Sequence, residues 1–108
     1  MANSRSTRKK KIRSIHVVGR RWFDRTYGNT YHTAAISVNG QFVHKTPVDY
    51  GYGEMYMQNA TAWLKKNGYL PGNKSYPTGG DEPLWQYCPR VGCSLVSDCA
   101  DVQRKKDL

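Results

Sequence analysis

Residues 12–23 are rich in Ile, Val and aromatic side chains, which predicts a first β-strand. Val18 and Trp22 fall on the even-numbered face, while Ile15 and Val17 fall on the odd-numbered face. Because successive side chains of a strand point to opposite sides, both faces carry apolar groups. We therefore expect one face to meet the core and the other to be covered in part.

A second alternating run, residues 30–38, ends at the dipeptide Asn39-Gly40. Both residues tolerate positive φ, which the type I′ turn of a two-residue hairpin requires. Residues 24–29 contain a second turn signal and connect the first two strands. The hairpin register is predicted to pair Val38 with Gln41, Ser37 with Phe42, and Ile36 with Val43. We expect Ile36, Val38 and Val43 on the core side.

Residues 54–67 place apolar side chains three and four positions apart, which predicts an amphipathic helix. Gly68 is suited to end this helix in the left-handed conformation, and Pro71 bars its continuation. The buried stripe is predicted to be Tyr56, Ala60, Trp63 and Leu64.

Residues 71–81 are rich in turn formers and are predicted to be a surface loop. Asp81 is expected to cap a short helix that begins at Glu82. Its inward side chains are predicted to be Leu84, Trp85 and Cys88, with its end at Pro89 and Gly92. Residues 94–97 fit a short last strand, and the pattern beyond them fits helix and coil equally.

This order of elements predicts an α+β fold. We expect a three-stranded antiparallel meander sheet packed by one main helix, with a small C-terminal helical cap, as a single domain over residues 12–108. A chain of 108 residues has the length of one domain. No apolar run approaches the roughly 18 residues of a transmembrane helix, so we expect no membrane partner.

Positive charge dominates the chain and is concentrated at its start. Lys and Arg number 17 against 8 acidic residues, giving a net charge of +9, and six of these cations lie within residues 1–13. Like charges repel, so residues 1–11 are predicted to be a flexible basic arm. Such an arm is either a solubilising tail or a phosphate-seeking segment, because cations release counterions from a polyanion. Its predicted anion contacts are Arg8, Lys9, Lys10 and Lys11.

The three cysteines do not match a structural zinc site. Cys88, Cys93 and Cys99 are separated by four and five residues and lack the paired C-x2-C spacing. The fourth ligand of a zinc ion would have to come from His16, His32 or His44. We therefore expect free thiols, buried or half-buried, and neither metal nor cofactor.

Catalytic signatures are missing from the sequence. There is no Walker loop, no nucleophile elbow, no H-E-x-x-H and no dinucleotide fingerprint, and the carboxylates are scattered. We therefore expect a protein that is not an enzyme.

Basic and aromatic residues interleave between positions 20 and 32, at the corner that joins the first two strands. Guanidinium groups bind phosphate in a bidentate manner, and flat rings stack on bases. We expect them to share one outward corner, although Trp22 and Phe23 also suit a core. The predicted nucleic-acid or anion contacts outside the arm are Arg20, Arg21, Arg25, Tyr27, Asn29, Tyr31, His32, Tyr52, Arg104 and Lys105.

Four short segments of the chain resemble a family of small bacteriophage proteins. They are RRWF at 20–23, YGNTYH at 27–32, YGYG at 50–53 and RKKDL at 104–108. The family has no established activity, so the resemblance implies a setting and not a mechanism. That setting is a phage gene expressed in the cytoplasm of a bacterial host.

Together these features predict a non-enzymatic phage accessory protein. Its partner is expected to be nucleic acid or a host complex that contains nucleic acid. One alternative is an inhibitor that binds a host defence protein, such as an anti-CRISPR protein, through an aromatic hot spot. Another is a sponge for a nucleotide signal.

Overall fold

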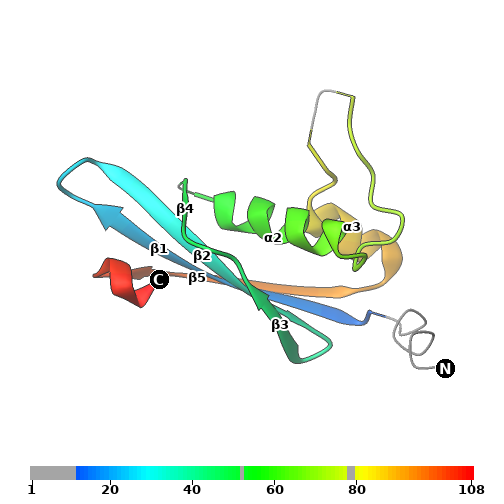
Figure 1. Ribbon diagram of the computed structural model, residues 1–108. Helices are drawn as coiled ribbons and strands as arrows, with labels where there is room; N and C mark the ends of the chain where they lie inside the picture. Colours follow the sequence, from blue (N-terminus) through cyan, green and yellow to red (C-terminus); the bar gives the residue numbers. More distant parts are fainter. Residues whose placement is uncertain (1–11, 52, 78–79) are drawn as a thin grey trace.

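The computed structural model describes residues 12–51, 53–77 and 80–108. The fold is α+β, with a mixed sheet of five strands and two helices (Figure 1). The α+β class is confirmed, and the three-stranded meander is wrong.

The strands are β1 (Ser14–Asp24), β2 (Asn29–Val38), β3 (Gln41–Lys45), β4 (Asp49–Tyr50) and β5 (Ser94–Val102). The helices are α2 (Met55–Lys66) and α3 (Leu84–Val91), followed by a 3-10 turn, η1 (Lys105–Asp107). The arm predicted at 1–11 lies outside the described residues.

The sheet has the order β3-β2-β1-β5, and β4 pairs with β2 beyond β3. Strands β1 and β2 are antiparallel over ten residue pairs, while β5 runs parallel to β1 over nine. The short strand predicted at 94–97 is therefore a long edge strand. Parallel pairing joins segments that are distant in sequence, so no local turn signal announces it.

The hairpin at Asn39-Gly40 is confirmed, with φ of 52° and 82° at its two turn residues. The first two predicted pairs of its register are also confirmed. The third is wrong, because Ile36 pairs with His44 and not with Val43. A β-bulge takes up the extra residue, and such a bulge leaves no signature in an alternating sequence.

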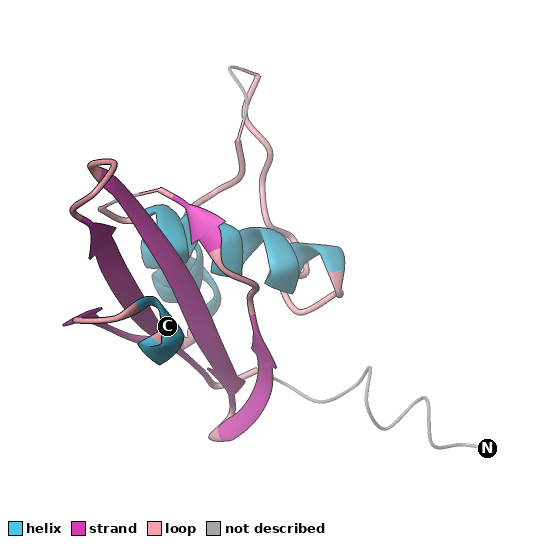
Figure 2. Ribbon diagram, turned by 60° about the vertical axis from the view of Figure 1, so that its left-hand side comes forward, coloured by secondary structure: helices cyan, strands magenta, loops and turns pink. Residues whose placement is uncertain are grey.

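Both helices cover one face of the sheet, here called the helix face, and η1 lies on the other, here called the open face (Figures 1 and 2). The core forms on the helix face, and the open face is covered in part, as predicted. Fully buried members of this core are Ile15 and Val17 of β1, Ala34 and Ile36 of β2, and Ala60 and Leu64 of α2.

Helix α2 forms where predicted and ends at Lys66, with Asn67 as its C-cap and the left-handed Gly68, at a φ of 80°, directly after it. Three of its four stripe residues are buried. The fourth, Trp63, is half-buried between the rings of His44 and Tyr69, with centroid distances of 4.3 and 5.6 Å. This stack closes the β3 side of the helix layer.

Helix α3 corrects two expectations about the C-terminal cap. Trp85 is 65% exposed, and Tyr87 is buried in its place. Asp81 does not cap the helix, since the N-cap is Pro83 and no side chain bonds there. The Asp81 carboxylate instead accepts a hydrogen bond of 2.6 Å from Lys65 of α2.

Pro89 does not end helix α3, which continues to Val91 and stops at Gly92 with a φ of 79°. A proline inside a helix removes one backbone hydrogen bond and does not always break the helix. Near the end of so short a helix, the left-handed glycine sets the boundary.

Glu82 and Arg90 tie the start of α3 to its last turn. The Glu82 side chain is 4% exposed, and it accepts hydrogen bonds of 2.5 and 3.0 Å from Arg90 Nη2 and Nε. These bonds lower the pKa of the Glu82 carboxyl, and burial opposes them only in part. The charged pair therefore stabilises the folded state at neutral pH.

Replacing Glu82 should change how stability depends on pH. A carboxylate with a lowered folded-state pKa contributes stability above its unfolded pKa of about 4.3, and loses it as the pH falls through the folded value. We expect Glu82→Gln to unfold at lower urea at pH 7 and to show a flatter loss of stability in acid. Glu54→Gln, at an exposed carboxylate without a capping hydrogen bond, is the control. An unchanged acid profile in Glu82→Gln would contradict this account.

The helix layer meets β1 at Gly19. A Cβ added there would lie 2.4 Å from Cδ2 of Tyr56, whose ring packs directly on the strand. Only glycine permits this approach. Beyond Gly19, the strand extends to Asp24, and this outer part carries the basic and aromatic residues.

We expect Gly19→Ala to cost roughly 1–3 kcal/mol of unfolding free energy, because the methyl group overpacks the contact. Adding Tyr56→Leu should recover part of that cost by removing the ring. Ser37→Ala on the open face should stay within about 0.5 kcal/mol of the parent. Urea unfolding measures all three, and additive effects of Gly19→Ala and Tyr56→Leu would show that the two sites do not touch.

Candidate nucleic-acid interface

Three aromatic rings lie side by side on the open face, at the end of the sheet beyond Gly19. We call Trp22 of β1, Tyr31 of β2 and Tyr50 of β4 the aromatic row. Trp22 and Tyr31 stack with centroids 6.0 Å apart, and Tyr31 meets Tyr50 edge-on at 5.9 Å. Both contacts follow from the pairing of these residues across strands. Tyr50 is 57% exposed, while Trp22 and Tyr31 are half-buried, so Tyr50 is the most accessible ring of the row.

His32 does not belong to the exposed surface where it was predicted. Its side chain is buried, with Nδ1 3.0 Å from the carbonyl oxygen of Gly51 and Nε2 2.8 Å from the Asn59 amide nitrogen. A carbonyl only accepts, so Nδ1 donates and Nε2 receives the Asn59 proton. His32 is therefore a positioning residue that holds the β4 segment against β2.

Asp49 completes this network from the surface. The Asn59 amide also donates to the Asp49 carboxylate at 3.0 Å, and the backbone N–H of Tyr50 donates to it at 2.8 Å. These two hydrogen bonds lower the pKa of Asp49. The network fixes both ends of a two-residue strand that would otherwise have few contacts, and so sets Tyr50 beside Tyr31.

The adjacent arginines Arg20 and Arg21 point to opposite faces of the sheet, so the single outward corner predicted for them is wrong. Arg20 lies on the open face and donates to the main-chain oxygen of Asp107 at 3.1 Å. Arg21 lies on the helix face. Alternation along a strand makes this separation unavoidable for neighbours in sequence.

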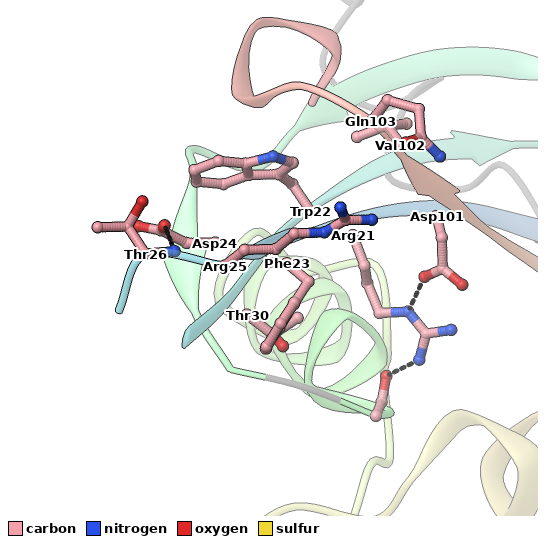
Figure 3. A pocket seen from close by; sticks show the side chains of 11 residues that line it. Arg21, Trp22, Phe23, Asp24, Arg25, Thr26, Thr30, Asp101, Val102 and Gln103 are labelled. Carbon is pink, nitrogen blue, oxygen red and sulfur yellow. Dashed lines mark hydrogen bonds and ion pairs between the residues drawn. The ribbon is translucent and has the colours of Figure 1, made fainter. Parts of the chain in front are cut away.

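Arg21 lines a polar cleft of about 640 Å³ at the end of β1, which we call the arginine cleft (Figure 3). Its Nε donates to Asp101 at 3.1 Å and its Nη1 to the carbonyl oxygen of Gly53 at 3.2 Å. Arg25 and Phe23 also line the cleft, and Phe23 is 54% exposed. Figure 3 shows Trp22 and Phe23 on opposite sides of β1.

The remaining predicted contacts fall into three groups. Tyr27, which is 78% exposed, and Arg25 lie in the turn between β1 and β2, with Asn29 half-buried at its end. Among the described residues, Arg25 has no ion-pair partner. Arg104 and Lys105 are exposed at the start of η1, where Arg104 pairs with Asp107 at 3.3 Å. The predicted contacts Arg8, Lys9, Lys10, Lys11 and Tyr52 lie outside the described residues.

Sequence reasoning did not assign three residues that the structure brings to this region. Trp22 and Phe23 were left open between core and surface, and both lie at the rim. Tyr50 joins the row because β4 pairs with β2. No signal within the sequence YGYG distinguishes Tyr50 from its neighbours, since the distinction depends on strand pairing.

Cys88 and Cys93 lie away from this interface, whereas Cys99 lies on β5 close to Arg21 and Asp101. All three are free, with Cys88 and Cys93 buried and Cys99 half-buried. Burial and the neighbouring Cys93 raise the pKa of Cys88 to about 12, so this thiol is a poor nucleophile near neutral pH. Within the described ranges, no three His, Cys, Asp or Glu side chains gather where they could hold a metal ion.

No described helix combines the length and apolar character that crossing a bilayer requires. Comparison with protein-family models, curated proteins and solved structures finds no match to this chain. The resemblance to phage proteins therefore stays a prediction, and the functional argument rests on the geometry of the site.

The two cleft arginines should differ in their effect on stability. Arg21 has two internal acceptors, so we expect Arg21→Gln to lower the unfolding free energy by about 1 kcal/mol. Arg25→Gln should stay within about 0.5 kcal/mol of the parent, because Arg25 is exposed and unpaired in the described part of the chain. Urea unfolding separates them, and equal losses would contradict the assignment of Arg25 as a residue available to a ligand.

Proposed function

We propose that this protein is a non-enzymatic phage accessory protein of the host cytoplasm that binds single-stranded nucleic acid at the end of its sheet. The aromatic row is the observation that carries the proposal. Exposed rings on a sheet bind unpaired bases by stacking, each base contributing about 1–3 kcal/mol. Bases inside a duplex do not offer their flat faces, so the row favours a single strand.

Positive charge near the row supplies the second component. Arg25 is exposed at the tip of the β1–β2 hairpin, and Arg21 in the cleft retains Nη2, for which no hydrogen bond to a described residue is present. Phosphates that approach from this end of the sheet meet Arg25, whose guanidinium is suited to bidentate binding, and the remaining donor of Arg21 on the helix face. The net charge of +9 adds a longer-range attraction for any polyanion.

A second surface favours the alternative of a protein-binding inhibitor. A cleft of about 670 Å³ between α2, α3 and β5 is lined by Met57, Leu84, Trp85 and Leu95. The exposed Trp85 is the type of side chain that dominates protein interfaces. Trp85 therefore supplies a control that separates the two functions.

Anisotropy of a fluorescein-labelled oligo(dT) tests the proposal. Tyr50→Ala should weaken binding roughly fivefold or more, because one stacked base is lost. Arg25→Gln should weaken binding and reduce the dependence of affinity on salt between about 50 and 200 mM. Trp85→Ala, at an exposed ring on another surface, should bind as the parent does.

A duplex probe and the two ring variants show whether binding occurs at the proposed site. The same sequence as a duplex should bind more weakly than the single strand. The proposed site would be overturned if the affinity did not change with salt concentration, or if the Tyr50→Ala variant bound as tightly as the parent. Loss of oligo(dT) binding in Trp85→Ala alone would move the interface to the other cleft.

A further inference from the structure

The C-terminal residues 105–108 lie on the open face, beside the aromatic row. Leu108, which follows η1, is 8% exposed but does not belong to the main core on the helix face. Figures 1 and 2 both show this segment on the side of the sheet opposite α2 and α3. Residues 105–108 therefore form a separate cover over part of the open face.

Two cations from different strands hold this cover through its backbone. Arg20 of β1 donates to the Asp107 oxygen at 3.1 Å, and Lys45, the last residue of β3, donates to the Leu108 oxygen at 2.9 Å. Beneath them, Thr33 of β2 is 2% exposed, although it faces away from the helices. The cover thus takes one hydrogen bond from each cation and shields the strand between them.

This covered site continues the aromatic row. Arg20 precedes Trp22 by two residues on the same face of β1, a spacing of roughly 7 Å along a strand. Arg20 pairs with Thr33 across the sheet, and Trp22 pairs with Tyr31 in the same way. Lys45 is opposite Ala35, the next residue of β2 on that face. Rings and cations therefore follow one another along the open face.

A phosphate can compete with the cover for both cations. Arg20 bonds the cover through one N–H to a neutral main-chain oxygen, whereas a phosphate offers a guanidinium two charged oxygens for a bidentate pair of hydrogen bonds. At Lys45, a phosphate oxygen would take the place of one oxygen of Leu108. We infer that Arg20 and Lys45 form a phosphate subsite for the strand that stacks on the aromatic row. Residues 105–108 occupy this subsite in the free protein, and the nucleic acid displaces them.

This inference rests on the proposed function. It adds that residues 105–108 and the nucleic acid compete for Arg20 and Lys45. When a bound segment must leave before a ligand binds, the observed affinity is the affinity of the open state multiplied by the fraction of molecules in that state. Weakening the cover should therefore strengthen nucleic-acid binding. Direct phosphate contacts from Arg104 and Lys105, as the sequence predicted, would give the opposite result on loosening this segment.

Leu108→Ser tests the competition without changing any charge. Loss of the buried leucine side chain should loosen the cover, and oligo(dT) should bind roughly three- to tenfold more tightly by anisotropy. Leu108→Met retains the apolar anchor and should bind as the parent does. Adding Arg20→Gln and Lys45→Gln should abolish the gain from Leu108→Ser, because the uncovered subsite then lacks its cations.

A second measurement needs no substitution. In a protein with isotope-labelled leucine methyl groups, the Leu108 signals should move on saturation with oligo(dT) to the shifts of a solvent-exposed leucine. Unmoved signals at saturation, or a Leu108→Ser variant that binds no more tightly, would overturn the subsite. If oligo(dT) does not bind the parent at all, the proposed function fails; if it binds through Tyr50 with no effect of Leu108, only the subsite fails.

Discussion

The pairing of β1 on both of its edges is the constraint on which the rest of this structure depends. An antiparallel partner on one side and a parallel partner on the other fix the strand in the centre of the sheet. Its side chains must then alternate strictly between the helix face and the open face. Burial of Ile15 and Val17 in the core decides which face each later residue takes. That decision sends Arg20 and Trp22 to the open face.

The boundary of the interface is set by packing and not by the basic residues themselves. Tyr56 can lie on β1 only because Gly19 has no side chain, and this contact anchors the first turn of α2. The strand beyond Gly19 projects past the anchor, so its rings stay accessible on both sides. His32 then fixes β4 against β2 and extends the accessible rings to a third strand. A row of rings needs both the free end of the sheet and this buried histidine.

Local signals predicted the elements whose structure is decided locally. The Asn39-Gly40 turn and the helix that stops at Gly68 depend on φ values that few residues adopt. Strand β5 depends instead on a partner some 80 positions earlier, and its exposed, polar sequence resembles a loop. The exposed position of Trp85 was missed because a helix of eight residues is too short for its pattern to reveal which side faces the core. The residues of the proposed interface could be predicted only in part. Trp22 and Tyr31 lie in a local hairpin, whereas Tyr50 and Lys45 reach the open face through sheet pairing.

The run Arg20-Arg21-Trp22-Phe23 illustrates how one sequence segment yields two surfaces. On the helix face, Arg21 and Phe23 border a cleft in which Asp101 already uses part of the charge of Arg21. On the open face, Arg20 donates to a neutral main-chain oxygen and has no ion-pair partner in the described part of the chain, and Trp22 has further rings beside it. A phosphate therefore displaces no carboxylate at Arg20, whereas it competes with one at Arg21. Under the proposed function, this difference in charge balance favours the open face over the arginine cleft for phosphate.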